Sequence, residues 1–175
     1  YVKLVVVFYN PKTKKFEVDP LLQARMPTMQ WGQKAKIGDF NGDGKTDIFL
    51  SAYTDMNHPV NAYVLINEGS SFTKISLGQE TWQHGLAVAD INGDGYDDVI
   101  AAGYSDFSQY LGSPTGLIKY KGMVGSSGVA LGDFLGNGLK QAIFVDAGSG
   151  SNDTFLYNIN LNNALKIIGF TKFST

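Results

Sequence analysis

The chain has 175 residues, a net charge of −2 and 43% hydrophobic residues, which is enough apolar material for one folded domain. Because acidic residues slightly outnumber basic ones, the sequence provides no basic surface, which argues against nucleic acid as a partner. No apolar run approaches the ~20 residues that span a bilayer, and the absence of cysteine excludes disulfides and thiolate metal sites. Because the chain starts at Tyr1 and shows no signal peptide, we expect a processed product or a segment of a longer protein.

The N-terminal segment 1–30 is expected to be the end of a preceding structural unit. Val2–Tyr9 predicts a strand, Asn10–Lys14 a turn and Lys15–Val18 a second strand. The only helical candidate, Asp19–Met26, is weak and has prolines near both ends. No Gly-Asp loop precedes these elements, so we interpret the segment as a partial unit.

Three related segments follow, at intervals of roughly 40–50 residues. They are KIGDFNGDGKTDIFLSAY (Lys36–Tyr53), AVADINGDGYDDVIAAGY (Ala87–Tyr104) and ALGDFLGNGLKQAIFVDAG (Ala130–Gly148). The aspartates that anchor them are Asp39, Asp90 and Asp133. The repeats divide the remaining chain into three units, 31–80, 81–124 and 125–175.

Each unit predicts four short strands, because runs rich in Val, Ile, Phe and Tyr alternate with turn residues. In unit 31–80 the strands are expected at Ala35–Phe40, Ile48–Tyr53, Ala62–Ile66 and Phe72–Ile75. In unit 81–124 they are expected at Leu86–Ile91, Val99–Gly103, Ser108–Leu111 and Leu117–Lys121. In unit 125–175 they are expected at Val129–Phe134, Ala142–Asp146, Thr154–Asn158 and Leu165–Phe170.

A repeat of four antiparallel strands is typical of one blade of a β-propeller. The predicted fold is therefore all-β, a single repeat domain of about three and a half propeller-like blades. Closed propellers need ~4–8 blades, so we expect a small propeller, part of a larger one, or one that other chains complete. A β-sandwich with accidental loop similarity is the alternative.

Two acidic loops, 39–47 and 90–98, carry the pattern D-x-N-x-D-x-x-x-D, with oxygen-bearing side chains at positions 1, 3, 5 and 9. Calcium takes six to eight oxygen ligands, and glycines at positions 4 and 6 allow the backbone to curl around an ion. Position 7 is expected to contribute its backbone carbonyl. The sequence predicts two Ca²⁺ sites, formed by Asp39, Asn41, Asp43, Lys45 and Asp47 and by Asp90, Asn92, Asp94, Tyr96 and Asp98.

Other interpretations of these loops are weaker. Magnesium prefers to keep several waters, and zinc lacks nitrogen and sulfur ligands here. An EF-hand requires Glu at position 12, where Leu50 and Ala101 stand, and helical rather than strand-like flanks. A metal-free Asx-rich hairpin is the remaining alternative, although three adjacent carboxylates repel one another without a cation.

The third loop is degenerate. Asp133 keeps position 1, but Leu135, Asn137 and Gln141 occupy positions 3, 5 and 9. One carboxylate is left, so we expect no calcium there. We expect the turn to persist and Leu135 to pack where a ligand would have been.

From Trp31-Gly32 to the C-terminus the sequence resembles FG-GAP repeats, which are related to VCBS-type repeats. His84-Gly85 and Ser127-Gly128 precede the second and third repeats as Trp31-Gly32 precedes the first. The resemblance implies a β-propeller like the integrin α-subunit head and several lectins. It also implies that each calcium loop joins the first two strands of a blade on one face of the disc, and that ligands meet another surface.

The function expected from this resemblance is a calcium-stabilised, non-catalytic adhesion or recognition module at an extracellular, cell or virion surface. Its partner would be a protein or a glycan. One alternative is a lectin-type propeller in which Tyr53, Trp82, Tyr104 or Tyr110 stack on sugar rings. Another is a non-catalytic domain of a larger surface enzyme.

Catalysis within the chain itself finds little support in the sequence. Of the two histidines, His84 is expected to pack and His58 to be exposed. Ser126-Ser127 lacks the strand–turn–helix context of a hydrolase nucleophile. Partner contacts are expected on the exposed loops Thr54–Asn61 and Gly148–Asp153, and Asn152-Asp153-Thr154 is a glycosylation sequon.

Overall fold

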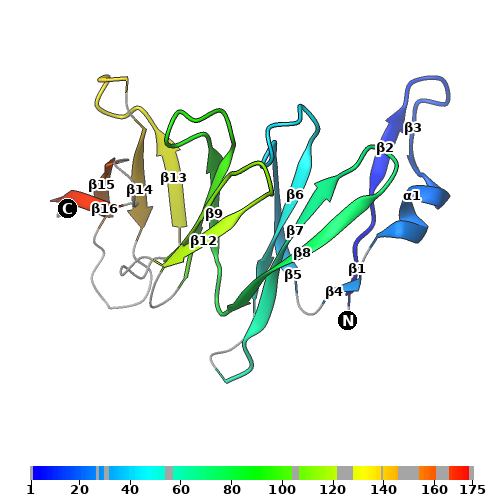
Figure 1. The fold of residues 1–175 in the computed structure, drawn as a ribbon, viewed down its shortest axis with the longest axis horizontal. Coiled ribbons are helices and arrows are strands. Elements are labelled where there is room, and N and C mark those ends of the chain that lie inside the picture. Colours follow the sequence, from blue (N-terminus) through cyan, green and yellow to red (C-terminus); the bar gives the residue numbers. More distant parts are fainter. Residues whose placement is uncertain are drawn as a thin grey trace.

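The computed structural model describes residues 2–26, 28–29, 32–53, 57–103, 107–121, 128–138, 140–145, 154–160 and 166–173. Within these ranges antiparallel strands dominate and form three four-stranded and two two-stranded sheets. The large sheets stand in a row in chain order, with the N-terminal elements at one end and the last sheet at the other (Figure 1). The predicted all-β fold of four-stranded blades is confirmed, and the described sheets form an open row rather than a closed ring.

Each large sheet is a meander in which consecutive strands are neighbours. Sheet one comprises β5 (Gly32–Gly38), β6 (Asp47–Ala52), β7 (Val60–Asn67) and β8 (Phe72–Glu80). Sheet two comprises β9 (Gly85–Ala89), β10 (Asp98–Ala102), β11 (Phe107–Leu111) and β12 (Ile118–Lys121). Sheet three comprises β13 (Gly128–Gly132), β14 (Gln141–Val145), β15 (Thr154–Asn160) and β16 (Lys166–Phe173). Every one of these strands overlaps a segment that the sequence predicted as a strand.

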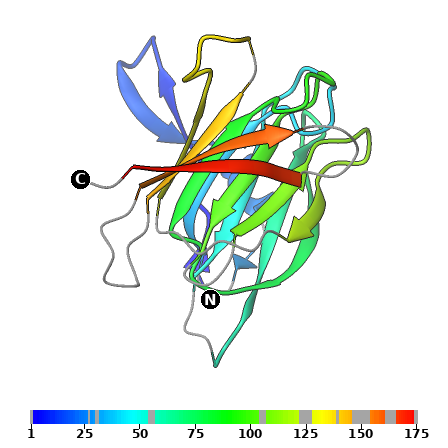
Figure 2. The same ribbon diagram turned by 90° about the vertical axis from the view of Figure 1, so that its left-hand side faces the viewer.

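The first strands of the three sheets, β5, β9 and β13, lie next to one another. The sheets stack with a twist, as the view along the row shows (Figure 2). In each sheet the connection between the first and second strands returns at the same edge of the row (Figure 1). This arrangement brings the repeated loops to one side of the molecule.

Strand β8 extends beyond its predicted end at Ile75 and reaches Glu80. The pairing of β7 with β8 shifts register between Asn61 and Tyr63, and Gly78 in β8 adopts a φ of 88°. A bulge of this kind bends a strand without ending it, and glycine tolerates the positive φ that it requires. The predicted strand therefore ends five residues too early.

The N-terminal region forms two small sheets and one short helix. The expected strand Val2–Tyr9 is divided into β1 (Val2–Lys3) and β2 (Val7–Asn10). Strand β1 pairs with β4 (Thr28–Met29), whereas β2 forms a hairpin with β3 (Lys15–Val18). The assignment of segment 1–30 to a partial blade stays a prediction.

The weak helical candidate forms α1 (Pro20–Arg25). The Asp19 carboxylate accepts hydrogen bonds from the backbone N–H groups of Leu21 and Leu22, at 2.8 and 3.0 Å. An aspartate N-cap followed by proline at the first helical position is a favourable helix start. Of the helices in the described ranges, none has the length and apolar character needed to cross a membrane.

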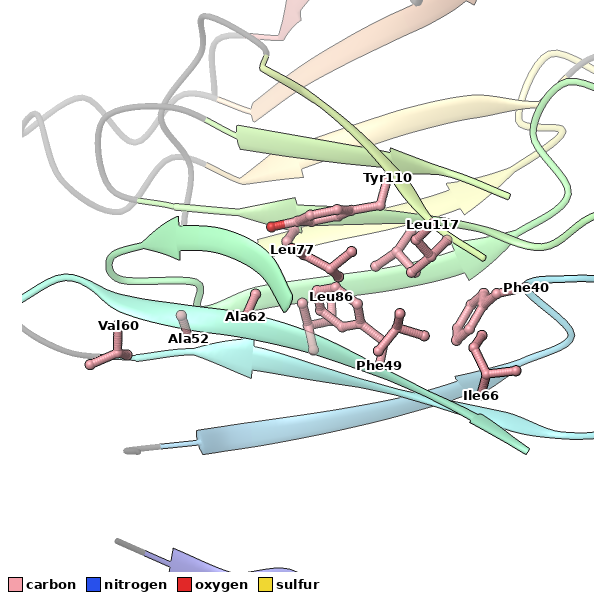
Figure 3. Packing of buried hydrophobic residues seen from close by; sticks show 13 residues of the cluster. Phe40, Phe49, Ala52, Val60, Ala62, Ile66, Leu77, Leu86, Tyr110 and Leu117 are labelled. Carbon is pink, nitrogen blue, oxygen red and sulfur yellow. The ribbon is translucent and has the colours of Figure 1, made fainter. Parts of the chain in front are cut away.

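The largest core lies between sheets one and two (Figure 3). Phe49 of β6 packs against Tyr110 of β11, with ring centroids 5.0 Å apart, and both side chains are fully buried. The remaining buried members are Phe40, Ala52, Val60, Ala62, Val64, Ile66, Leu77, Leu86, Val99, Ala101 and Leu117. Burial of such apolar surface is the dominant favourable term in folding, so this core joins the first two sheets.

A second core joins sheets two and three. Phe107 of β11 lies 5.0 Å from Phe144 of β14, measured between ring centroids, and Ile100 and Ala142 are buried beside them. Sheet two is therefore apolar on both faces and is packed between two neighbours. Such a sheet cannot be stable alone, which is the physical basis of stacked repeats.

A buried polar network also links sheets one and two. The Tyr110 hydroxyl accepts a hydrogen bond from Gln83 Nε2 (2.9 Å) and donates to the Glu80 carboxylate (3.3 Å). Ser108 also donates to Glu80, at 2.7 Å, and Lys119 forms an ion pair with it. Burial and the neighbouring Glu80 charge raise the pKa of Tyr110. Every polar group named here has a partner, as buried groups require.

Candidate metal centre

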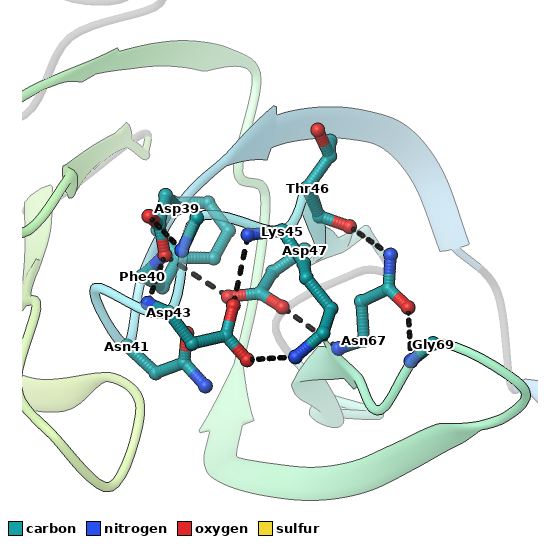
Figure 4. Close-up of polar contacts among 10 residues, drawn as sticks. Asp39, Phe40, Asn41, Asp43, Lys45, Thr46, Asp47, Asn67 and Gly69 are labelled. Atoms are coloured by element: carbon teal, nitrogen blue, oxygen red, sulfur yellow. Dashed lines mark hydrogen bonds and ion pairs between the residues drawn. The ribbon is translucent and has the colours of Figure 1, made fainter.

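Loop one, residues 39–47, connects β5 to β6 and is held by its own acidic side chains (Figure 4). The two carboxylate oxygens of Asp39 accept hydrogen bonds from the backbone N–H groups of Asp43 (3.1 Å) and Gly44 (2.8 Å). The Asn41 side-chain oxygen accepts from the same Asp43 N–H, at 3.2 Å. Side-chain oxygens at positions 1 and 3 thus converge on one backbone donor. Gly42 and Gly44 have φ values of 72° and 78°, which glycine adopts without strain.

Asp43 and Lys45 occupy the exposed rim of this loop. Lys45 Nζ lies 2.8 Å from Asp43 Oδ2. The hydrogen bond from the Lys45 ammonium lowers the pKa of Asp43, and its partner raises the pKa of Lys45. Because both groups are exposed, this ion pair contributes little stability. A cation entering the loop would compete with the lysine for Asp43.

Loop two, residues 90–98, connects β9 to β10 and repeats this geometry. Asp90 accepts hydrogen bonds from the backbone N–H groups of Asp94 (3.2 Å) and Gly95 (3.0 Å), and additionally from Gly93 (2.7 Å). Asn92 accepts from the Asp94 N–H at 3.0 Å. The two loops are therefore structural as well as sequence repeats.

The aspartates at position 9 are fully buried and join each loop to its sheet. Asp47 accepts hydrogen bonds from the backbone N–H groups of Phe40 (3.0 Å) and Asn67 (2.7 Å). Asp98 accepts from those of Ile91 and Gly112, both at 2.8 Å. Asp47 thus links loop one to the end of β7, and Asp98 links loop two to the connection between β11 and β12.

Burial makes the charged form of these two carboxylates costly. Desolvation raises the pKa of Asp98 to about 6, and the charges of Asp94 and Asp90 add to the increase against the opposing backbone N–H groups. Burial, with the charges of Asp43 and Asp39, also raises the pKa of Asp47. The acidic residues within each loop therefore repel one another in the absence of a cation.

Loop three, residues 133–141, has the same turn with one carboxylate. Asp133 accepts hydrogen bonds from the backbone N–H groups of Asn137 (3.0 Å) and Gly138 (2.8 Å), as the anchors of loops one and two do. Gln141 is buried at position 9 and accepts from the Leu135 N–H at 3.1 Å. The turn thus requires an aspartate at position 1 and an acceptor at position 9, but no further acid. The expectation that Leu135 packs inward is wrong, because 52% of its surface is exposed.

The donor sets of loops one and two suit a hard cation, because they consist entirely of carboxylate, amide and carbonyl oxygens. Their present orientation is different: most of these oxygens accept hydrogen bonds from the loop backbone. Within the described ranges, no group of three acidic or histidine side chains is arranged to hold a metal ion. Both calcium sites stay predictions.

Asp97 joins the two acidic loops, a role that the sequence reading missed. Its carboxylate accepts a hydrogen bond from the Asp39 N–H, and its own N–H donates to the Asp39 carbonyl, both at 2.9 Å. Ser113 N–H donates to the Phe40 carbonyl at 3.2 Å. Loop two is thereby bonded to the first residue of loop one. The available signal was the acid at position 8, where loop one has Thr46 and loop three has Lys140.

Close packing reinforces this contact between the loops. The Tyr96 ring lies against Gly42, where an added Cβ would approach the ring to 2.6 Å. A Cβ on Gly38 would lie 2.9 Å from the Asp97 carboxylate. Glycine at both positions permits the loops to meet, so the two predicted metal sites are direct neighbours.

The aromatic residues proposed for sugar stacking differ in accessibility. Tyr110 is fully buried, so its assignment as a stacking residue is wrong. Tyr53 and Trp82 are partly exposed and pack with His84, with ring centroids 5.0–5.8 Å apart. His58 is exposed. Trp31, Tyr104, Ser126-Ser127, Gly148–Asp153, Asn152 and residues 54–56 of the first loop lie outside the described residues.

Replacing Asp98 with alanine separates the hydrogen-bonding role of position 9 from metal binding. At pH 6 without calcium, we expect Asp98→Ala to lower the free energy of unfolding by about 2 kcal/mol or more, because two buried N–H groups lose their acceptor. Burial raises the pKa of Asp98 to about 6, so at that pH the buried side chain is charged only part of the time. Removing its desolvation cost therefore offsets little of the lost hydrogen bonding. Asp94→Ala, at an exposed position, should change the same quantity by less than about 1 kcal/mol. Urea unfolding measures both, and equal effects would contradict the assigned roles.

Replacing Asp97 tests the contact between the loops. Asp97→Ala should lower the free energy of unfolding by about 1–2 kcal/mol, because the Asp39 N–H loses its partner. Asp97→Asn keeps an acceptor oxygen and should restore most of the loss. Thr46→Ala, at the equivalent exposed position of loop one, is the matched control and should have little effect. Thermal unfolding of the four proteins would disprove the contact if Asp97→Ala behaved like the control.

Residues 39–101 match the family model described as the FG-GAP-like repeat, and this range includes both acidic loops. No solved structure matched the chain. The predicted resemblance to FG-GAP repeats is confirmed over this range, and a repeat of this kind suggests a module of the adhesion or recognition type. Residues 39–101 of this chain are therefore similar to the FG-GAP-like repeat.

Proposed function

We propose that the chain is an extracellular or surface-exposed, non-catalytic recognition module in which two Ca²⁺ ions stabilise neighbouring loops. The observation that carries the proposal is the contrast between the loops. Loop three forms the same turn with one carboxylate, whereas loops one and two each carry three carboxylates at positions 1, 5 and 9. The additional acids are unnecessary for the turn and raise the pKa of the buried aspartates. A bound cation would offset this repulsion.

The residues that would hold the ions are those of positions 1, 3, 5, 7 and 9. In loop one these are Asp39, Asn41, Asp43, the Lys45 carbonyl and Asp47; in loop two they are Asp90, Asn92, Asp94, the Tyr96 carbonyl and Asp98. Calcium modules outside cells bind at ~10⁻⁴–10⁻³ M, so ions held with such an affinity would be bound outside cells and lost inside them. The ions would act as structural elements of the two loops.

Calcium dependence of thermal stability tests this function. At a free calcium concentration about 100 times the dissociation constant, each site should add about 2.7 kcal/mol to the free energy of unfolding. The melting temperature should therefore rise during a calcium titration and fall again with chelator. Magnesium at equal concentration should have a smaller effect, because it retains its water ligands.

Position 5 provides matched controls for this titration. The double variant Asp43→Ala/Asp94→Ala should lose the calcium-dependent rise, whereas Asn137→Ala in loop three should keep it. An unchanged melting temperature of the unmodified chain throughout the titration would contradict structural calcium.

Glycan recognition is a second candidate, favoured by the cluster of Tyr53, Trp82 and His84. These residues follow β6 or precede β9, so they lie at the end of the sheets opposite the acidic loops. Trp82 adopts a φ of 52°, an uncommon conformation for a non-glycine residue and one that occurs at binding sites. Partly exposed aromatic rings offer a stacking surface for the apolar face of a sugar.

Binding to a glycan array in calcium-containing buffer tests this candidate. Any glycan recognised by the chain should bind at least about ten-fold more weakly to Tyr53→Ala, which corresponds to about 1.4 kcal/mol of binding free energy. Tyr120→Ala is the control, because Tyr120 is an exposed tyrosine on β12, outside the cluster. Absence of any binder, or equal loss in both variants, would reject this site.

A further inference from the structure

Each of the three repeated loops contains an asparagine followed directly by glycine. The dipeptides are Asn41-Gly42, Asn92-Gly93 and Asn137-Gly138. Glycine has no side chain to hinder its own backbone nitrogen, so this nitrogen can reach the side-chain carbonyl carbon of the preceding asparagine. The three dipeptides therefore share one chemistry, and the hydrogen bonds around each of them decide how readily it reacts.

The hydrogen bonds of the glycine nitrogen differ among the loops. The Gly93 N–H of loop two donates to the anchor aspartate of that loop at 2.7 Å, and the Gly138 N–H of loop three donates to its own anchor at 2.8 Å. The Gly42 N–H of loop one makes no hydrogen bond among the described residues. A nitrogen that attacks a carbonyl must give up its proton and develop negative charge, which a bonded carboxylate opposes. Gly42 therefore carries the most reactive of the three nitrogens.

The asparagine amide, which is the leaving group, is also held differently in loops one and two. Asn92 Nδ2 donates to the Asp94 carboxylate at 2.7 Å, and its departure would break a charge-assisted hydrogen bond. In loop one the equivalent Asp43 Oδ2 accepts from Lys45 Nζ at 2.8 Å (Figure 4). The cause lies at position 7, where loop one has a lysine that binds this carboxylate and loop two has Tyr96.

The Asn41 side chain is oriented towards the glycine nitrogen. Its Oδ1 accepts a hydrogen bond from the Asp43 N–H at 3.2 Å, so the side chain folds back over the peptide group that precedes Gly42, as in an Asx-turn. This bond also withdraws electrons from the carbonyl that is attacked. The Tyr96 ring packs on Gly42 through ring carbons rather than through its hydroxyl. Asn41 is partly exposed and Gly42 is exposed, so water reaches the dipeptide.

We propose that Asn41 is a site of spontaneous deamidation, and that it reacts in preference to the asparagines of loops two and three. The Gly42 nitrogen loses its proton and bonds to Asn41 Cγ, the Cγ–Nδ2 bond breaks, and Nδ2 leaves with the proton as ammonia. Water then adds to either carbonyl of the resulting cyclic imide and opens the ring. Opening at one carbonyl gives aspartate, and opening at the other gives isoaspartate, in which the main chain runs through the side-chain carbonyl.

The modification changes the charge of loop one. It replaces a neutral amide by a carboxylate at position 3, between Asp39 and Asp43, and the isoaspartate form also lengthens the backbone of the loop. Position 3 is one of those that the proposed function assigns to calcium. The deamidation itself depends on neither calcium nor a glycan, so it is measured in the presence of chelator, and its result leaves the proposed function untouched.

Peptide mapping by mass spectrometry of the folded, full chain during storage at neutral pH tests the preference. Asn41 should convert at least about ten-fold faster than Asn137, because the Gly138 N–H must first leave a charged acceptor. Asn92 should also react more slowly than Asn41. In the urea-unfolded chain the three rates should converge, because each asparagine then precedes glycine without a fixed partner. Equal rates in the folded chain, a faster Asn92 or Asn137, or a product that contains no isoaspartate would overturn the proposal.

A lysine variant tests the role assigned to position 7. Lys45→Met frees the Asp43 carboxylate to bind the Asn41 amide, as the corresponding carboxylate does in loop two. It should slow the conversion of Asn41 at least about three-fold, because one more hydrogen bond then holds the leaving nitrogen. Lys36→Met, at an exposed lysine of β5, is the matched control and should leave the rate unchanged. Circular dichroism confirms that both variants are folded, and equal Asn41 rates in the two would count against the proposal.

Discussion

Phe49 packs on Tyr110 at one side of sheet two, and Phe107 packs on Phe144 at the other. This pair of contacts imposes the constraint on which the rest of the structure depends. A sheet that is apolar on both faces needs a neighbour on each side, so the three sheets must stack in one direction. The loops between the first and second strands then lie along one edge, and loops one and two become adjacent.

The adjacency of the loops has its own chemical consequence. Asp97 binds both the N–H and the carbonyl of Asp39, so the first residue of one acidic loop is held by the eighth residue of the next. Buried Asp47 and Asp98 tie the same loops to their sheets. Hydrogen bonds therefore determine the backbone of both loops, and a cation would act on a conformation that already exists. Its main contribution would be to offset the repulsion among the carboxylates.

Much of the fold could be predicted because its signals are local. Alternating Val, Ile and Phe residues, interrupted by Asn-Gly and Asp-Gly turns, predicted the strands of all three sheets. The exceptions had nonlocal causes. Strand β8 continues past its predicted end at Ile75 through a bulge at Gly78, opposite β7. Tyr110 was predicted to stack on sugars but lies in the core, with its hydroxyl bonded to Gln83 and Glu80.

The candidate site, like the fold, was predicted from the sequence only in part. Sequence spacing alone identified the two acidic loops, the degeneracy of the third, and the oxygen donors that suit calcium. The tertiary structure alone revealed that Asp97 joins the loops, that Asp47 and Asp98 are buried, and that Leu135 is exposed. The physical reason is that the period of a repeat specifies local turns and faces, whereas burial and contacts between loops depend on which sheets become neighbours.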